Sequence, residues 1–255
     1  MNTLVIGGSG FLGSFVCDQL TNEGHNVRIF DRNISPWLKA DQEMIVGDLI
    51  DDSDLENAIS GCETIYNFAA ISDLDEALHK PIESVMINVL GNVKILEACV
   101  KFKVRRYIFA STVYVSSREG GFYRCSKKSA EHYVEEYFRT YGLEYTILRY
   151  GSLYGPRSDS RNSIWRIVKK ALESGEVFYE GSSEAIREYI HVEDAAKASI
   201  TALGEDFRNQ NVVLTGHEPM KVVDFLKMLA EIMGLSEEAV NFKEAEHIGH
   251  YVRTP

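Results

Sequence analysis

Cysteine is scarce in this chain of 255 residues. The four cysteines, Cys17, Cys62, Cys99 and Cys125, stand far apart and show none of the spacings typical of metal sites. This excludes a disulfide scaffold and a cysteine-based zinc module as explanations of the fold. We expect all four side chains to be buried, reduced thiols.

Basic residues are outnumbered, and long apolar runs are missing. The sequence has 27 Lys and Arg against 38 Asp and Glu, which gives a formal net charge of −11. This balance argues against a general nucleic-acid binder, whose affinity rests on clustered positive charge. No apolar run is long enough to span a bilayer, and Met1 leads into an expected strand with no room for a signal peptide. We expect a cytoplasmic protein with a small-molecule ligand and with neither nucleic acid nor a membrane as partner.

The histidines give no metal site either. His247 and His250 form an H-x-x-H pair near the end of the chain, without further ligands nearby in the sequence. We therefore predict no metal centre.

The most informative stretch that is present is TLVIGGSGFLG, residues 3–13. A short apolar run suited to a buried strand leads into spaced glycines, and a helix is expected from about Phe11. Such a turn presents backbone N–H groups and the positive end of a helix dipole to a pyrophosphate. The stretch therefore predicts a bound nucleotide.

The glycine spacing can be interpreted in two ways. Gly8, Gly10 and Gly13 fit G-x-G-x-x-G. With Gly7 in place of Gly8 the spacing becomes G-x-x-G-x-x-G, and both versions predict the same ligand. Side chains at Gly7 and Gly10 would keep the pyrophosphate away from the backbone, while Gly13 lets the helix approach the strand.

The residues after the next two expected strands indicate which nucleotide binds. Asp31 ends the second strand, where a carboxylate can accept both hydroxyls of an adenosine ribose and would repel a 2′-phosphate. This favours NAD over NADP, although Arg32 can pair with a phosphate or stack on adenine. Asp48 and Leu49 follow the third strand and can meet the adenine.

Apolar strands alternate with amphipathic helices from Met1 to about Arg149, which indicates a parallel sheet covered on both faces. The predicted fold is α/β, a Rossmann-type doubly wound sheet, with 1–150 as the NAD-binding domain that carries the catalytic residues. We expect 151–255 to form a small substrate-binding lobe, some segments of which return to the main sheet. The expected strands of the main sheet are Asn2–Ile6, Asn26–Asp31, Glu43–Val46, Thr64–Phe68, Arg106–Ala110 and Glu144–Arg149.

Two long helices are predicted in the first domain. The first runs over 82–102, where an apolar stripe at helical spacing is expected to pack in the core. The second runs over 123–141. An exposed face of either helix can serve a dimer, and we expect a homodimer. The stripe consists of Val85, Val89, Val93, Leu96 and Val100.

The second lobe begins with a loop over 151–162 that is rich in Gly, Ser, Arg and Pro, a composition typical of functional loops. A helix is expected over 164–174. Short strands and two further helices follow it, with strands near 177–179, 188–191 and 211–214 and helices near 192–203 and 222–233.

A candidate catalytic pair lies at the start of the second long helix. Tyr123 and Lys127 are four residues apart, so both side chains lie on one face, and the ammonium can favour the ionised phenol. Such a tyrosine is a usable general base. Ser111 and Thr112 end the fifth strand, at the edge of the sheet where ligands bind, and their hydroxyls can reach the same substrate oxygen.

These motifs together resemble the extended short-chain dehydrogenase/reductase family, in particular its NAD-dependent nucleotide-sugar epimerases and dehydratases of the UDP-glucose 4-epimerase type. The resemblance covers nearly the whole chain. Its blocks are GGSGFLG at 7–13, GDL at 47–49, NFAA at 67–70, ST at 111–112, Y-x-x-x-K at 123–127, LRY at 148–150, YGPR at 154–157 and REYIHV at 187–192.

The resemblance implies roles for the catalytic residues. Tyr123 is implied to be the acid and base, and Thr112 to hydrogen-bond the reacting hydroxyl. Lys127 is implied to lower the pKa of Tyr123 and to hold the nicotinamide ribose.

The same resemblance implies binding residues for cofactor and substrate. Phe68, Ala69 and Ala70 are implied to line the cofactor. Arg187 is implied to pair with the diphosphate of the substrate. The segment from Tyr150 to Ser152 is implied to flank the nicotinamide and the sugar. Further cofactor contacts are implied for Gly7, Gly10, Phe11, Leu12, Gly13, Asp31, Arg32, Asp48, Leu49, Ser111, Tyr123 and Lys127.

Departures from the family pattern bear on the reaction. Family dehydratases carry Asp-Glu after the threonine, where this chain has Val113 and Tyr114, so dehydration is disfavoured. Ser152 stands where most members have Asn, which shortens one expected substrate contact. The sequence also ends where relatives continue with more of the substrate lobe.

The sequence therefore predicts NAD-dependent epimerisation of a nucleotide diphosphate sugar, with C4 of a UDP-hexose as the expected position and a transient 4-keto sugar as intermediate. One alternative is a net redox enzyme, a dehydrogenase, reductase or decarboxylase, acting on a sugar nucleotide. Another is a non-catalytic NAD-binding regulator on the same fold.

Overall fold

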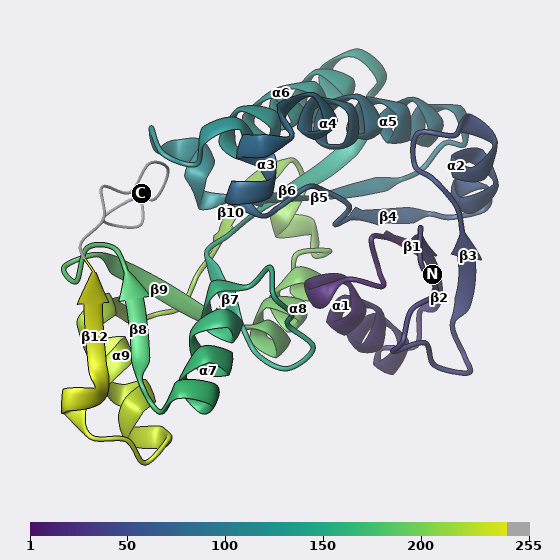
Figure 1. Cartoon of the computed structure of the whole chain (residues 1–255). Helices are drawn as coiled ribbons and strands as arrows, with labels where there is room; N and C mark the ends of the chain where they lie inside the picture. The colour runs from purple at the N-terminus through teal and green to yellow at the C-terminus, as the bar shows by residue number, and fades with distance from the viewer. Residues whose placement is uncertain (244–255) are drawn as a thin grey trace.

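The computed structural model describes residues 1–243 and is organised around a seven-stranded parallel sheet in the order β10-β6-β5-β4-β1-β2-β3. The predicted α/β doubly wound fold is confirmed (Figure 1). No helix within 1–243 has the length and apolar character to cross a membrane. The strands are β1 (Asn2–Ile6), β2 (Asn26–Asp31), β3 (Glu43–Val46), β4 (Thr64–Asn67), β5 (Arg106–Thr112), β6 (Glu144–Tyr150) and β10 (Gln210–Leu214).

Helices cover both faces of this sheet, as Figure 1 shows. The apolar side chains of β1, β4 and β5 alternate between two cores, one beneath α2, α5 and α6 and the other beneath α1 and α8. The helices of this part are α1 (Phe11–Asn22), α2 (Asp52–Ile59), α3 (Leu74–His79), α4 (Pro81–Val85), the π-helical η1 (Met86–Gly91), α5 (Asn92–Lys101), the 3₁₀ turn η2 (Val113–Ser116), α6 (Gly121–Tyr141), α8 (Val192–Thr201) and the 3₁₀ turn η3 (Glu205–Phe207).

The expected single helix over 82–102 is wrong in detail, because α4, η1 and α5 follow one another with a π-helical turn in the middle. The wider turn changes the face that is buried. Val85 of the predicted core stripe is 56% exposed, whereas Leu96 is buried and Val89, Val93 and Val100 are half-buried. The buried positions of η1 and the start of α5 include Asn88 and Asn92, which satisfy their polar groups by hydrogen bonds.

The thiol prediction also needs a correction. Cys17, Cys62 and Cys99 are buried as expected, but Cys125 is exposed. It lies on α6 outside the face formed by Ser126, Lys127 and other buried residues of the helix, and therefore points to solvent.

A smaller lobe follows β6 and has its own apolar core, formed around Val177, Phe225 and Leu226. Its elements are β7 (Ser152–Tyr154), α7 (Ser163–Ser174), β8 (Val177–Glu180), β9 (Ile186–His191), β11 (Pro219–Lys221), α9 (Val222–Ile232), η4 (Glu237–Ala239) and β12 (Val240–Lys243). Strands β11, β9 and β7 form one sheet, and β12 pairs with β8 in another.

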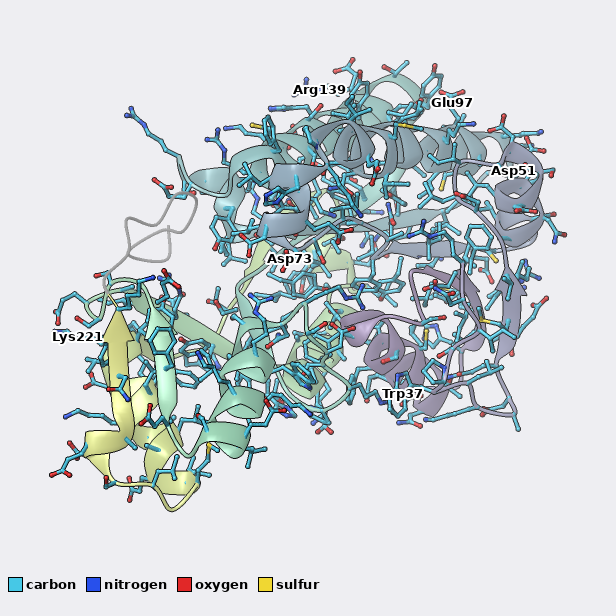
Figure 2. The ribbon with its side chains drawn as sticks, viewed as in Figure 1. Trp37, Asp51, Asp73, Glu97, Arg139 and Lys221 are labelled. Carbon is cyan, nitrogen blue, oxygen red and sulfur yellow. The ribbon has the colours of Figure 1, made fainter. Side chains whose placement is uncertain are left out.

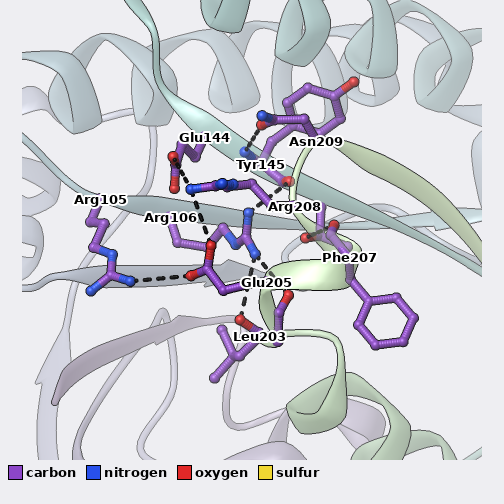
Figure 3. Close-up of polar contacts among 11 residues, drawn as sticks. Arg105, Arg106, Glu144, Tyr145, Leu203, Glu205, Phe207, Arg208 and Asn209 are labelled. Atoms are coloured by element: carbon purple, nitrogen blue, oxygen red, sulfur yellow. Dashed lines mark hydrogen bonds and ion pairs between the residues drawn. The ribbon is translucent and has the colours of Figure 1, made fainter.

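The segment from α8 to β10 returns to the main sheet, where β10 pairs in parallel with β6. Figure 3 shows the contacts that hold it there. The Arg106 guanidinium of β5 donates to the carbonyl oxygens of Leu203 and Gly204 at 3.4 and 3.2 Å. Asn209 is held by Tyr145, whose N–H donates to its side chain. The division of the chain into two domains at residue 150 remains a prediction. Helix α8 and strand β10 lie outside the small lobe.

Candidate active site

The turn between β1 and α1 has the geometry that its glycines require. Gly7 takes φ +78°, and a Cβ there would lie 2.7 Å from the Ala69 backbone nitrogen. A Cβ on Gly13 would lie 2.3 Å from the Gly7 carbonyl oxygen, so this glycine lets α1 approach β1. A Cβ on Gly10 would meet that oxygen alone among the described atoms, at 3.2 Å. Gly8 packs against core side chains, so the spacing that shapes the turn is Gly7, Gly10 and Gly13.

A cleft of about 560 Å³ opens at this turn and runs along the carboxyl ends of the central strands. This is where open α/β sheets bind ligands. Thr112 and Ser152, predicted for the substrate, line it. All the residues predicted to bind the cofactor line it too, namely Gly7, Gly10, Phe11, Leu12, Gly13, Asp31, Arg32, Asp48, Leu49, Phe68, Ala69, Ala70, Ser111, Tyr123, Lys127 and Tyr150.

Asp31 is fixed at one end of the cleft. Its Oδ2 accepts a hydrogen bond from the Ser9 N–H at 3.1 Å, and its Oδ1 accepts one from the Asn33 N–H at 3.2 Å. The carboxylate at the end of β2 is therefore joined to the glycine turn. Its predicted contact with the adenosine ribose stays a prediction.

Arg187 is not brought to the cleft. It lies on β9 with 7% exposure, and its Nη1 donates to the Ile186 carbonyl oxygen at 3.0 Å. Burial raises the pKa of the Tyr179 phenol, and the charge of Arg187 and its hydrogen bond with that phenol partly offset this rise. Its predicted contact with the substrate diphosphate stays a prediction.

The candidate catalytic residues meet at the carboxyl end of β5. Thr112 is the last residue of that strand, and Tyr123 and Lys127 come from the first two turns of α6. Lys127 is 2% exposed, and its Nζ donates to the Ala110 carbonyl oxygen at 2.8 Å. Its ammonium also lies 4.8 Å from the centre of the Phe109 ring. The three side chains therefore share one buried corner of the cleft.

The electrostatics of Tyr123 differ from the prediction. Burial raises the pKa of its phenol well above the ordinary value, and a hydrogen bond with Thr112 partly offsets this rise. The predicted lowering by Lys127 is not found in the chain alone. The reason is that desolvation of this corner disfavours every charged form, the phenolate included.

Burial acts on Lys127 in the opposite direction and lowers its pKa to about 7. The carboxylate of Glu131, one turn further along α6, partly offsets this effect. Glu131 is itself buried and binds Arg149 of β6 through two hydrogen bonds of 3.0 and 2.7 Å. A buried ion pair thus lies directly behind the lysine.

A measurement of stability against pH tests the protonation state of Lys127. The unfolded chain holds this proton up to its ordinary pKa of 10.5, whereas the folded chain releases it near 7. Folding is therefore penalised below about pH 7, and the penalty disappears as the pH rises toward 10. We expect the unfolding free energy of the wild type, measured against Lys127→Met by urea titration, to rise by up to about 1.4 kcal/mol per pH unit across this range. A difference that is flat with pH would contradict the assignment.

Sequence reasoning missed a polar link between the cofactor side and α6. Asn88 of η1 donates from Nδ2 to the Ile71 carbonyl oxygen at 3.0 Å and to Ser126 Oγ at 2.9 Å. Ser126 Oγ in turn donates to the Tyr123 carbonyl oxygen at 2.8 Å. The available signal was an asparagine pair four residues apart, Asn88 and Asn92, within the otherwise apolar stretch 85–93, since buried polar residues need partners.

It also missed residues on the far side of the cleft. Asp159, Arg161 and Asn162 line the cleft from the loop between β7 and α7. Arg161 binds the Asp159 carboxylate, with its Nη2 at 2.6 Å from Oδ2. The loop composition predicted a functional segment but not its residues, because irregular backbone carries no periodicity.

The prediction that there is no metal centre can be compared with the structure only over residues 1–243. Within 1–243, no group of three or more His, Cys, Asp or Glu side chains is placed to hold an ion. His247 and His250 lie outside the described residues.

Together, the doubly wound sheet, the glycine turn and the Tyr-Lys pair in one cleft define a nucleotide-binding enzyme of the α/β class. Comparison with known proteins identifies the family. The sequence profile of the NAD dependent epimerase/dehydratase family matches residues 3–215. The chain belongs to this family, which confirms the predicted resemblance and the NAD cofactor.

Individual relatives cover most of the chain. A putative UDP-glucose 4-epimerase of Methanocaldococcus jannaschii is 30% identical over 95% of this chain and 86% of its own. The structure of a UDP-glucose 4-epimerase of Thermotoga maritima with UDP-glucose has a TM-score of 0.89 at 27% identity and covers 100% of this chain and 89% of its own. The structure of the UDP-glucose 4-epimerase of Thermus thermophilus with NAD has a TM-score of 0.88 at 25% identity and covers the same shares.

The cleft fits an NAD molecule by its own geometry. The position of a Cβ on Gly10 is open except for one oxygen, so a phosphate can approach the start of α1. Ser111 Oγ is buried, its residue is 3% exposed and lines the cleft, and the hydroxyl has no hydrogen-bond partner within the described chain. A buried hydroxyl of this kind requires a partner, which a ligand in the cleft supplies.

Proposed function

We propose that the protein catalyses the NAD-dependent epimerisation of a nucleotide diphosphate sugar, with inversion at C4 of a UDP-hexose through a transient 4-keto sugar. The observation that carries the proposal is the gathering of Thr112, Tyr123 and Lys127 at the end of β5, in the same cleft as the glycine turn. This places a proton-transfer group next to the expected site of hydride transfer.

Each residue has a role in this reaction. Bound NAD supplies the acceptor and donor of a hydride at its nicotinamide ring. Tyr123 Oη takes the proton of the sugar hydroxyl during oxidation and returns it during reduction. Thr112 Oγ1 holds that hydroxyl by a hydrogen bond, and the ammonium of Lys127 favours the phenolate form of Tyr123.

The acidic residues of the cleft favour epimerisation over dehydration. Among the described residues, the carboxylates that line it are Asp31, Asp48 and Asp159. Asp31 and Asp48 follow β2 and β3 at the end expected to hold adenosine, and Asp159 pairs with Arg161. Beside Thr112 the chain places Val113 and Tyr114, neither of which can act as a carboxylic acid toward a leaving hydroxyl.

We assign substrate binding to the smaller lobe. Ser152 of β7 lines the cleft beside Tyr150, and Arg187 is the cation proposed for the diphosphate. In this proposal residues 1–150 hold NAD and the catalytic groups, and the part of 151–255 outside α8 and β10 holds the nucleotide sugar.

We propose a homodimer formed by the outer face of α4, η1 and α6. Ile82, Met86 and Leu90 are 76%, 43% and 44% exposed there, and Phe122 at the start of α6 is 48% exposed. Several large apolar side chains with this much exposure on one face favour a protein partner.

The interface is tested by sedimentation of Ile82→Glu. We expect the wild type to sediment as a dimer and the variant as a monomer, because a carboxylate in an apolar interface is not solvated. Leu172→Glu is the matched control, since Leu172 is 72% exposed on α7 in the other lobe. A monomeric wild type would contradict the proposal.

The reaction is tested by incubating the protein with NAD and UDP-, GDP- and dTDP-sugars while NADH absorbance and sugar products are followed together. A new stereoisomer without net NADH supports epimerisation and names the substrate. NADH with an oxidised product assigns the protein to the net redox alternative. Bound NAD without turnover of any sugar nucleotide supports the alternative of a non-catalytic NAD-binding regulator.

A further inference from the structure

The loop and first helical turn over 155–166, here called the strap, contain a second set of residues that line the cleft. The strap joins β7 to α7, and Figure 1 shows this loop extending toward α1. Asp159, Arg161 and Asn162 of the strap line the same cleft as Asp31. The Asp159 carboxylate is the main cause of the raised pKa of Arg161, and Asp31 is near enough to add to it. The strap therefore lies against the adenosine end of the cleft.

One residue, Arg157, fastens the strap to α1. Its guanidinium donates from Nη2 to Asp18 Oδ2 at 2.7 Å. The same group lies 4.3 Å from the ring centre of Phe15 and 4.7 Å from that of Trp37, so two aromatic rings hold it. Figure 2 labels Trp37 beside α1. Lys39 adds a second cation on Asp18, at 3.1 Å from Oδ1.

This contact is unlike an ordinary surface ion pair. The side chains of Arg157 and Asp18 are 19% and 16% exposed, so both charges are largely removed from solvent. Arg157 also takes φ +64°, a left-handed conformation that costs energy for a residue other than glycine. Such a conformation persists only where surrounding contacts stabilise it, which the ion pair and the two rings do.

The contact connects three walls of the cofactor site. Phe15 and Asp18 belong to α1, whose first residue lines the cleft. Trp37 and Lys39 directly follow a cleft-lining segment that runs from Asp31 to Pro36. Arg157 belongs to the strap. The single side chain of Arg157 therefore contacts both other walls.

The opposite end of the strap has a weaker attachment. Arg166 donates to the Ser160 carbonyl oxygen at 2.9 Å and lies 3.4 Å from Asp73 Oδ2. Asp73, labelled in Figure 2, caps α3 directly after the cleft-lining Ile71 and Ser72. Arg166 is 46% exposed, so this pair is better screened than that of Arg157.

We propose that Arg157 is a positioning residue that holds the strap against the adenosine end of the cleft and thereby sets the residence time of the bound dinucleotide. The inference rests on the cofactor site of the proposed function. An epimerase returns its cofactor to the starting state in every cycle and has no need to exchange it. A strap held from both ends suits that chemistry, whereas net oxidation would require it to open at each turnover.

The test is the rate at which bound NADH leaves the protein when it is displaced by excess NAD and followed by its fluorescence. Arg157→Met keeps the apolar stem but removes the charge, and we expect it to release NADH faster by about tenfold or more. Arg157→Lys keeps the charge but not the planar stacking, and we expect an intermediate rate. The matched control is Arg208→Met, since Arg208 forms an exposed pair with Glu144 at 3.1 Å on β6.

The proposal is supported if both Arg157 variants release NADH faster than the wild type while Arg208→Met releases it at the wild-type rate. If Arg157→Met does not fold, Arg157→Lys alone decides. A lower melting temperature with an unchanged NADH release rate would show that the residue is merely structural and overturn the inference. The assay contains no sugar nucleotide, so a failure of the proposed reaction leaves this result readable.

Discussion

Replacing Tyr123 with phenylalanine is expected to reduce turnover by about a thousandfold or more while NADH still binds. The substitution removes one oxygen from a side chain that lines the cleft beside Thr112 and Lys127. Without it the corner lacks the phenol that the proposal assigns to the proton of the reacting hydroxyl. The ring and its packing remain, so the fold and the cofactor site are preserved. The measurement is kcat on the sugar nucleotide that is turned over among the UDP-, GDP- and dTDP-sugars. NADH affinity is measured in parallel by fluorescence.

Tyr133→Phe is the matched control for this substitution. Tyr133 lies on the same helix but is 44% exposed, so the loss of its hydroxyl should leave kcat unchanged. Full activity in Tyr123→Phe would remove Tyr123 from the mechanism. Loss of NADH binding together with turnover would instead mean that the phenol holds the cofactor.

Two glycine substitutions separate folding from cofactor binding. A methyl group on Gly13 would lie 2.3 Å from the Gly7 carbonyl oxygen, and neither backbone can yield without separating α1 from β1. We expect Gly13→Ala to lower the unfolding free energy by about 3 kcal/mol or more, measured by urea titration. The loss should be accompanied by loss of NADH binding, because the same turn carries the N–H groups proposed to bind the phosphates.

Gly10→Ala is the matched partner of that variant. Its methyl group would meet one oxygen at 3.2 Å and otherwise project into open space, and Gly10 has an ordinary φ of −79°. Stability should change by less than about 1 kcal/mol, while NADH affinity falls because the methyl group occupies the approach of the phosphate. Equal stability losses in the two variants would contradict the roles assigned to these glycines.

Much of the fold could be predicted because the first 150 residues follow simple periodic rules. Buried parallel strands appear as short apolar runs, and the glycine turn and Asp31 mark the end of β1 and of β2. In the register of β5 with β6, Thr112 pairs with Tyr150, so the carboxyl ends of the two strands meet. The catalytic corner was therefore predictable from residues close to strand ends.

The errors come from places where tertiary contacts override local pattern. The π-helical turn places Asn88 at a buried position and leaves Val85 of the predicted stripe exposed, and a plain 3.6-residue period cannot foresee this. Arg187 is a different case, because its guanidinium donates to the Ile186 carbonyl oxygen and its contact with the substrate diphosphate stays a prediction. The strap residues lie in irregular backbone, where Arg157 finds partners more than a hundred residues away in sequence.

The most direct test of the proposed reaction uses a UDP-hexose that carries deuterium at C4, supplied to the protein with unlabelled NAD. Oxidation at C4 followed by return of the same hydride equivalent predicts a C4 epimer that keeps its deuterium at C4, with no accumulation of reduced cofactor. A C4 epimer that carries protium at C4, or reduced cofactor that accumulates with an oxidised sugar, would contradict the transient oxidation proposed for the cleft of Thr112, Tyr123 and Lys127.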